Sequence, residues 1–251
     1  MNLIFKIKLL FTLSLLFMVT ACSQKLQTKQ SSYKAQFVVT NAISEGSYPS
    51  ENTSISTHSD FAKTHYPKKI VEFKKNPLEK NDIVFLGNSI TEQGGDWGKR
   101  LNNSKVKNRG ISGDTTDGVL ARLGEIINCK PTQVFILIGI NDLFREEISS
   151  KDVFKNILKI VKQIHLKSPT TKIFVHTILP TTTLNIKNKI QNANILLKNA
   201  ETKEPFQLID LHNEFTDKDG LMDSQLSIDG VHLNEEGYNI WSNKIMNLIH
   251  I

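Results

Sequence analysis

Short runs of consecutive apolar residues alternate along the chain with longer segments in which apolar residues recur every three or four positions. Continuous apolar runs are typical of strands in a parallel sheet that helices cover on both faces. Three such runs occupy residues 83–86, 134–138 and 173–175, and a more polar extended stretch at 106–108 is a fourth candidate strand. The pattern therefore predicts a mostly parallel sheet.

The segments between these runs carry apolar residues at helical spacing. Two stripes are clear, and their members are Val153, Ile157, Ile160 and Ile164 in the first and Tyr238, Trp241, Ile245 and Leu248 in the second. Residues 115–127 and 184–199 predict two further helices, and residues 67–75 predict one that Asn76-Pro77 ends. Strands and helices thus alternate, which predicts an α/β layered domain.

The first residues have the pattern of an export signal. Lys6 and Lys8 precede the uncharged run LLFTLSLLFMVTA, whose 13 residues are too few to cross a hydrocarbon core of about 30 Å as a helix. Residues 19–22 resemble a bacterial lipobox, which implies cleavage before Cys22 and attachment of lipid to it. A plain secretory signal with a chance cysteine is the alternative. We expect residues 1–21 to be a lipoprotein signal peptide.

The composition then changes twice. Residues 22–60 are expected to be the lipidated cysteine and a flexible tether, because Ser, Thr, Gln and Asn predominate and apolar residues are sparse. Regular patterning begins near residue 61, so residues 61–251 are predicted to form one domain. Acyl chains on Cys22 would hold the protein on a membrane. We therefore expect an exported, membrane-anchored lipoprotein of the bacterial cell envelope, facing the periplasm or the cell surface.

Polar, glycine-rich segments follow the predicted strands, and ligands of open α/β sheets bind beyond the carboxyl ends of strands. Ser89 lies in the first of these segments, where its simpler role is a helix N-cap paired with Glu92. Near the C-terminus, His232 follows Asp229 by three residues, close enough for the carboxylate to hold the ring in one tautomer. A serine nucleophile needs such a base, although a histidine in a surface loop is the simpler interpretation.

Two further segments contain possible hydrogen-bond donors. Attack on an ester carbonyl builds an oxyanion, which fixed donors stabilise. Gly113 offers a backbone N–H that a ligand can approach closely, and Asn141 offers a side-chain amide. A turn and a loop cap are their simpler roles. Only the occurrence of these residues together, in this order and each after a strand, favours a catalytic role over the simpler roles.

The segments together strongly resemble the SGNH (GDSL-like) hydrolase family, whose name records Ser, Gly, Asn and His. The four blocks read FLGNSIT, NRGISGDTT, LIGIND and DGVHLN, and the resemblance spans residues 82 to about 249. The GDTT and VLARL segments look most like the platelet-activating-factor acetylhydrolase-like branch. The resemblance implies a three-layer α/β/α flavodoxin-like sandwich around a central, mostly parallel five-stranded sheet.

The resemblance also implies a role for each matching residue. Ser89 would be the nucleophile, His232 the base and Asp229 its orienting carboxylate. The oxyanion hole would consist of the N–H groups of Ser89 and Gly113 and the side-chain amide of Asn141. No metal or other cofactor is expected.

One residue departs from the family's pattern. Asn88 stands where the first block usually has an aspartate. Asparagine has nearly the same shape and still accepts a hydrogen bond, but it lacks the negative charge beside the nucleophile. Because the carboxylate assigned to the histidine is Asp229, we expect activity to survive this change.

Several other classes of site lack their motifs. The sequence has no G-x-S-x-G elbow, no H-E-x-x-H, no paired cysteine motif, no P-loop and no G-x-G-x-x-G. The remaining histidines are scattered, so we expect surface or packing roles for them, and Cys129 is also expected to pack. Two alternatives from other classes stay open: a flavodoxin-like binder of phosphate or a cofactor at residues 87–91, and a non-catalytic glycan-binding lipoprotein.

The leading hypothesis is a serine esterase that cleaves small acyl esters, above all acetyl esters, through an acyl-enzyme. Its substrates would be small molecules or glycans with O-acetyl groups, and a lysophospholipase or lipid acetylhydrolase is the alternative. Because few apolar residues such as Trp97 stand near the blocks, we expect a small, open site.

The charge distribution argues against a nucleic-acid partner. The chain has a formal net charge of +6, but residues 81–251 contain 20 basic and 20 acidic residues. The excess lies in the signal, the tether and the segment before the first predicted strand, where lysines near an anionic bilayer would favour the membrane. The predicted catalytic region is neutral overall, so nothing indicates a nucleic-acid surface.

Overall fold

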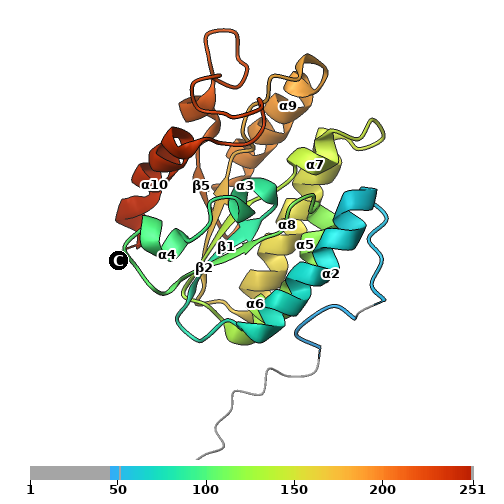
Figure 1. The fold of residues 1–251 in the computed structure, drawn as a ribbon, viewed down its shortest axis with the longest axis vertical. Coiled ribbons are helices and arrows are strands. Elements are labelled where there is room, and N and C mark those ends of the chain that lie inside the picture. Colours follow the sequence, from blue (N-terminus) through green and yellow to red (C-terminus); the bar gives the residue numbers. More distant parts are fainter. Residues whose placement is uncertain (1–45, 51, 250–251) are drawn as a thin grey trace, which may run out of the picture. The chain divides into compact units, whose positions relative to one another are not determined.

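The computed structural model describes residues 46–50 and 52–249. Their centre is a parallel sheet with the strand order β2-β1-β3-β4-β5 (Figure 1). The strands are β1 (Ile83–Gly87), β2 (Val106–Gly110), β3 (Gln133–Leu137), β4 (Lys172–His176) and β5 (Gln207–Ile209). The predicted five-stranded sheet is confirmed, and all its pairings are parallel.

Helices cover the sheet on both faces, as the α/β/α prediction requires. The helices are α2 (Asp60–Lys75), α3 (Ser89–Glu92), α4 (Trp97–Arg100), α5 (Thr116–Ala121), α6 (Leu123–Cys129), α7 (Ile140–Leu143), α8 (Ser150–Lys167), α9 (Leu184–Ala200) and α10 (Glu235–Ile249), with a short 3-10 helix at His212–Phe215. In Figure 1, α4 and α10 lie on one side of the strands, and α2, α5, α6 and α8 lie on the other.

Three strands end in register at one edge of the sheet. Gly87, the last residue of β1, pairs with Gly110 at the end of β2 and with Leu137 at the end of β3. No side chain fits at Gly87, because a Cβ atom would lie 2.2 Å from the hydroxyl of Thr91 and 2.4 Å from the carbonyl oxygen of Leu137. The segments that follow these strands therefore begin side by side.

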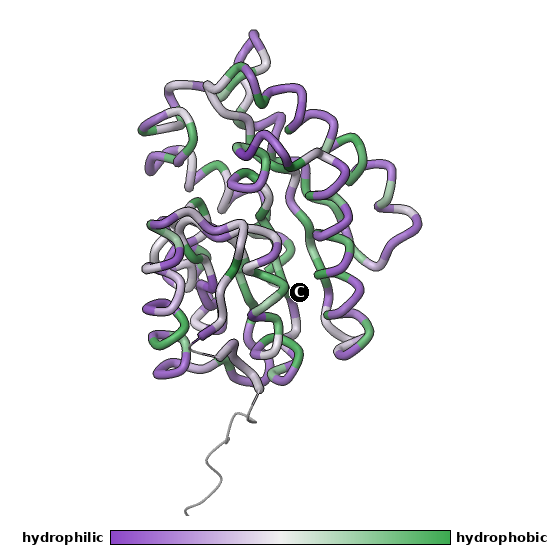
Figure 2. The backbone as a smooth tube through the Cα atoms, turned by 90° about the vertical axis from the view of Figure 1, so that its right-hand side faces the viewer, coloured by the Kyte–Doolittle hydropathy of each residue, from purple (hydrophilic) through white to green (hydrophobic). Residues whose placement is uncertain are grey.

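The first predicted helical stripe is buried, and so is the second except for Leu248, which is half-buried. Val153, Ile157, Ile160 and Ile164 of α8 are each at most 1% exposed. On the other face, Trp241 of α10 packs edge-on against Trp97 of α4, with ring centres 4.6 Å apart. Hydrophobic stretches run through the central strands, whereas hydrophilic residues are frequent in the outer segments (Figure 2).

The helix predicted over residues 115–127 is in fact two helices. Arg122 separates α5 from α6, with φ −110° and ψ 14°. Its buried guanidinium donates to the carboxylate of Asp114 and to the carbonyl oxygens of Arg109 and Gly87. These contacts fix Arg122 over the strand ends, and the backbone leaves helical geometry at this point.

The strand β5 was not located by the apolar pattern. It is three residues long, and Gln207 at its start is exposed. As the edge strand of the sheet, it pairs with β4 alone. A short, half-exposed edge strand lacks the continuous apolar run that marks the central strands.

The packed region begins before residue 61, where the domain was predicted to start. Ser59 caps α2, which begins seven residues earlier than the predicted helix over 67–75. Upstream of it, Ser47, Ile55 and His58 are buried. The predicted tether over 22–60 is therefore too long at its C-terminal end, since polar composition concealed residues that bond to the domain.

The predicted signal peptide, the lipidation site Cys22 and most of the tether lie outside the described residues. Within residues 46–50 and 52–249, no helix has the length and apolar character needed to cross a membrane.

Candidate active site

Ser89 is the first residue of α3, directly after β1. The helix is capped by Asn88, whose side-chain oxygen accepts a hydrogen bond from the N–H of Ile90 at 3.1 Å. The capping role considered for Ser89 thus belongs to its neighbour, which leaves the Ser89 hydroxyl available for another contact. Ser89 itself is 7% exposed.

His232 lies between Ser89 and Asp229, although 143 positions separate it from the serine in sequence. Its Nε2 atom is 2.9 Å from the Ser89 hydroxyl oxygen, and its Nδ1 atom is 2.7 Å from a carboxylate oxygen of Asp229. A carboxylate only accepts, so we assign the ring proton to Nδ1. This tautomer leaves the lone pair of Nε2 facing the serine hydroxyl.

Asp229 is held in its ionised form. Its other carboxylate oxygen accepts hydrogen bonds from the N–H groups of Val231 and His232, at 3.0 and 2.8 Å. Burial opposes ionisation, but the hydrogen bonds from the His232 side chain and from these N–H groups outweigh it and lower the pKa of Asp229 to about 2. Asp229 therefore carries a negative charge at neutral pH.

The turn between Asp229 and His232 requires glycine at position 230. Gly230 has a φ of +86°, and its N–H donates to the Ser227 hydroxyl at 2.8 Å. The same hydroxyl donates to the carbonyl oxygen of His232 at 2.6 Å, and the N–H of Thr182 donates to the carbonyl oxygen of Gly230 at 3.0 Å. The loop is thus tied both to itself and to the segment after β4.

Gly113 lies in the loop between β2 and α5 with a φ of +80°. A Cβ atom there would come within 2.8 Å of the Ala62 side chain on α2, so the position needs glycine for conformation and for space. Among the described residues, the backbone N–H groups of Gly113 and Ser89 have no hydrogen-bond acceptor. Both are available to a substrate oxygen.

Asn141 lies on α7, directly after β3. Its side-chain amide donates to the carbonyl oxygen of Asp114 at 2.8 Å. An amide has two N–H groups, so one remains for another acceptor. Because Asp114 follows Gly113 in sequence, this bond joins the two elements that carry the candidate donors.

The neighbouring Asp142 was missed by sequence reasoning. It is 2% exposed, and its carboxylate accepts hydrogen bonds from the backbone N–H of Thr116 at 3.1 Å and from the Thr116 hydroxyl at 2.6 Å. Burial raises the pKa of Asp142 to about 6 despite these bonds. The residue ties α7 to the start of α5, a second link beside that of Asn141.

A second acidic group, Glu92, contacts the loop between β2 and α5. Glu92 of α3 accepts hydrogen bonds from the N–H of Ser112 at 2.5 Å and from His65 of α2 at 3.0 Å. Burial opposes its ionisation, but these two partners lower the pKa of Glu92. Its spacing from Ser89 was the only signal in the sequence, and it indicated a helix cap instead of a link to the loop.

Trp97 lies in the core and does not border the site. It is 1% exposed, stacks on Phe85 and donates from its ring nitrogen to the carbonyl oxygen of Thr91 at 2.9 Å. Cys129 is half-buried, and burial raises the pKa of its thiol to about 12. That thiol donates to the carbonyl oxygen of Glu79, which fits the packing role expected for it.

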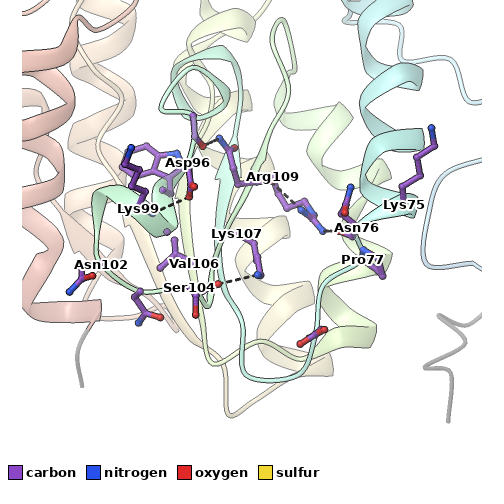
Figure 3. Close-up of a pocket in the computed structure, with 16 residues that line it drawn as sticks. Lys75, Asn76, Pro77, Asp96, Lys99, Asn102, Ser104, Val106, Lys107 and Arg109 are labelled. Atoms are coloured by element: carbon purple, nitrogen blue, oxygen red, sulfur yellow. Dashed lines mark hydrogen bonds between the residues drawn. The ribbon is translucent and has the colours of Figure 1, made fainter. Parts of the chain in front are cut away.

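A cavity of about 1250 Å³ lies beside the edge strand β2 (Figure 3). Lys107 on its wall donates to the carbonyl oxygen of Ser104, and the N–H of Lys99 donates to Asp96. None of the five candidate site residues lines it, so it is not part of the candidate site. In the described part of the chain, no three His, Cys, Asp or Glu side chains are grouped so as to hold a metal ion.

The candidate residues coincide with a known family pattern. The model of the GDSL-like Lipase/Acylhydrolase family matches residues 85–240, which include all five of them. In sequence, the chain is similar to the N-acylneuraminate cytidylyltransferase of Escherichia coli O18:K1:H7, with 26% identity over 183 residues. The match covers 70% of this chain and 42% of that protein, so the chain spans less than half the length of this curated relative.

Solved structures of other proteins share the fold. A Streptococcus pneumonia protein named for platelet activating factor has a TM-score of 0.67 and 23% identity, covering 76% of this chain and 95% of its own. A carbohydrate esterase family 3 protein from Talaromyces cellulolyticus has a TM-score of 0.55 and 17% identity, covering 67% of this chain and 97% of its own. At these identities the likeness concerns the fold.

Proposed function

The chain belongs to the GDSL-like Lipase/Acylhydrolase family, and from this membership we propose that it is a serine esterase that hydrolyses small acyl esters, above all acetyl esters. The single observation that carries the proposal is the continuous hydrogen-bonded path from Ser89 through His232 to Asp229. Neither a cofactor binder nor a glycan-binding protein without activity requires this path.

The geometry supports a double displacement. His232 takes the proton of the Ser89 hydroxyl through Nε2 as the serine oxygen attacks the ester carbonyl. The charge of Asp229 stabilises the imidazolium that forms. The tetrahedral intermediate then expels the alcohol, which receives the proton from His232 and leaves an acyl group on Ser89. Water repeats the sequence, releases the carboxylic acid and restores the serine.

The negative oxygen of the tetrahedral intermediate needs donors that are fixed beforehand. We assign this role to the backbone N–H groups of Ser89 and Gly113 and to the free N–H of the Asn141 amide. Asn141 is held by Asp114, and the backbone of Ser112 is held by Glu92, so the loop is anchored on both sides. Fixed donors of this kind are worth several kcal/mol of barrier each.

The alcohol part of the substrate is best explained as a sugar. The side chains of Asp229 and His232 are 49% and 24% exposed, which leaves space for a bulky, hydrated leaving group. Phe61 of α2 is 59% exposed, and its ring lies 3.5 Å from where a Cβ atom of Gly113 would be. An exposed aromatic face beside the donor loop suits packing against a sugar ring.

The names of two similar proteins agree with this substrate class, since one is a carbohydrate esterase and the other acts on an N-acylneuraminate, which is a sugar acid. The name of the Streptococcus pneumonia protein refers to platelet activating factor, which is a phospholipid, so lipid esters are the second candidate class of substrate. An apolar chain gains about 0.8 kcal/mol for each methylene that it buries, so a lipid substrate requires an apolar wall.

An ester series separates these candidates. Hydrolysis of p-nitrophenyl acetate, butyrate, hexanoate and octanoate by the full-length chain should be fastest with acetate, and acetate should be released from O-acetylated glycans. The Ser89→Ala variant is the matched control for both assays. Activity that rises from acetate to octanoate would favour the lipid ester instead.

The site of action belongs to the same proposal. The lipobox at residues 19–22 supports an exported lipoprotein anchored through lipid on Cys22. In a bacterial host, the full-length chain should incorporate radiolabelled palmitate and sediment with membranes, whereas Cys22→Ser should incorporate none. Equal labelling of both forms would contradict the anchor.

A further inference from the structure

We propose that Thr57 and His58, in the segment before α2 (residues 46–50 and 52–59), are positioning residues for the loop that carries Gly113. This inference rests on the proposed function, because it assigns the loop a task in ester hydrolysis. Neither residue stood out in the sequence, because the segment has the composition of a polar tether and His58 is one of several scattered histidines.

His58 is buried against the loop. It is 4% exposed, and its Nε2 atom lies 2.9 Å from a carboxylate oxygen of Asp114, which is fully buried. A carboxylate accepts, so the ring nitrogen donates. Gly118 provides the space for this pair, because a Cβ atom there would lie 1.8 Å from the Asp114 carboxylate and 2.5 Å from His58 Nε2.

Asp114 connects this contact to the proposed oxyanion donors. Its carboxylate also accepts hydrogen bonds from Arg122 at 2.9 Å and from the N–H of Thr115 at 3.0 Å. Its backbone carbonyl accepts the Asn141 amide, and its backbone nitrogen is bonded directly to Gly113. A shift of Asp114 therefore moves both the Gly113 N–H and the acceptor that orients Asn141.

The residue before His58 makes a second contact with the same loop. The hydroxyl of Thr57 is 2.7 Å from the hydroxyl of Thr115. The carbonyl oxygen of Thr57 accepts a hydrogen bond from Arg145, which follows α7, at 3.4 Å. The segment thus holds the donor loop and contacts a residue that follows α7, the helix that carries Asn141.

This arrangement predicts a specific kinetic effect. Oxyanion donors act only when they are held at hydrogen-bond distance from the position of the developing charge. Without His58, one oxygen of the buried Asp114 carboxylate loses its side-chain partner, and the loop loses a tie to the segment before α2. Substrate binding in the ground state does not use these donors, so kcat should fall while KM stays nearly constant.

The experiment compares His58→Ala, His58→Gln and Thr57→Val in the full-length chain, with p-nitrophenyl acetate as the substrate. We expect kcat of H58A to fall at least tenfold with KM within twofold of wild type. Glutamine can donate to Asp114 and should recover most of the loss. T57V, which removes the hydroxyl contact with Thr115, should lower kcat by a smaller factor.

Tyr48→Phe is the matched control. Tyr48 lies in the same segment, but its hydroxyl donates to Glu125 and to the carbonyl oxygen of Phe73, away from the loop. Y48F should keep wild-type kcat even if its Tm falls. If kcat fell as much in Y48F as in H58A, the effect of His58 would be explained by a general loss of stability, and the inference would be overturned.

The remaining outcomes are distinct. A wild-type protein without turnover would overturn the proposed function and this inference together. An active wild type with unchanged kcat in H58A, or with no recovery in H58Q, would overturn the inference alone. If H58A does not fold, T57V tests the inference in its place. An unchanged kcat in T57V would then overturn the inference.

Discussion

The side-chain amide of Asn141 donates a hydrogen bond to the carbonyl oxygen of Asp114, at 2.8 Å. The two residues follow different strands, β3 and β2, which are separated in the sheet by β1. The bond therefore crosses above β1, the strand that precedes Ser89, and joins the two segments that carry Gly113 and Asn141. It sets the amide plane of Asn141 while leaving one N–H for a substrate oxygen.

Replacement of Asn141 tests the oxyanion hole. Asn141→Ala should lower kcat by about 10²- to 10³-fold, the loss typical for one oxyanion donor, with little change in KM. Steady-state kinetics with p-nitrophenyl acetate measure both values. Asn141→Asp keeps the size of the side chain but removes the donor, so it should be equally impaired. Wild-type kcat in the aspartate variant would exclude a donor role for this residue.

The carboxylate of Asp229 is expected to act through its charge. Because the pKa of Asp229 is about 2, the group is ionised at every pH above about 4, including the assay pH of 7. Asp229→Asn keeps the shape but removes the charge and the preference for one ring tautomer, so kcat should fall by about 10²- to 10⁴-fold. A decrease of less than threefold would show that His232 needs no carboxylate partner.

Asn88 should tolerate the aspartate that is usual in the family. Its side-chain oxygen caps α3, a task that an aspartate oxygen can perform, and its buried side-chain nitrogen has no partner in the described structure. Asn88→Asp should therefore stay within about tenfold of wild-type kcat/KM. If only the aspartate variant were active, the natural asparagine would mark a loss of function.

The link between Asp142 and Thr116 should give a pH-dependent stability. Burial raises the pKa of Asp142 from 3.8 to about 6, so the folded protein binds this proton more tightly than the unfolded chain does. The free energy of unfolding, relative to Asp142→Asn, should fall as pH rises from about 4 to 6 and stay constant above that. The full change is about 3 kcal/mol at most.

Urea unfolding of wild type and D142N at several pH values between 4 and 8 measures this difference. The comparison cancels the titration of the other groups, because the two proteins differ only at residue 142. A difference that rises with pH would mean that the folded state favours the ionised form of Asp142 instead.

Much of the fold was predictable because its strands are buried on both faces. Val84, Phe85 and Leu86 of β1 are wholly buried, and such runs stand out from amphipathic helices. The break between α5 and α6 was not predictable, since it depends on contacts of Arg122 with strand ends distant in sequence. The short strand β5 has no continuous run of buried apolar residues by which it could be recognised.

The contacts that join Ser89, His232 and Asp229 were predictable because each of these residues lies in a motif that resembles one family. Their supporting residues were not. His58 and Glu92 contact the loop, and Asp142 contacts the start of α5, through individual hydrogen bonds that leave no periodic signal in a sequence. The tether prediction failed at its C-terminal end for the same reason, because polar residues that are bonded to a domain look like polar residues in solvent.

The contact between Ser89 and His232 is the feature on which the proposed hydrolysis depends. The full-length wild type, Ser89→Ala and His232→Ala should be assayed for release of p-nitrophenol from its acetate ester, with mass spectrometry of the protein after a rapid acid quench. We expect an acetyl group on the peptide that contains Ser89 in the wild type, and a loss of kcat of at least about 10³-fold in both variants. Unchanged hydrolysis by S89A would contradict the proposed function.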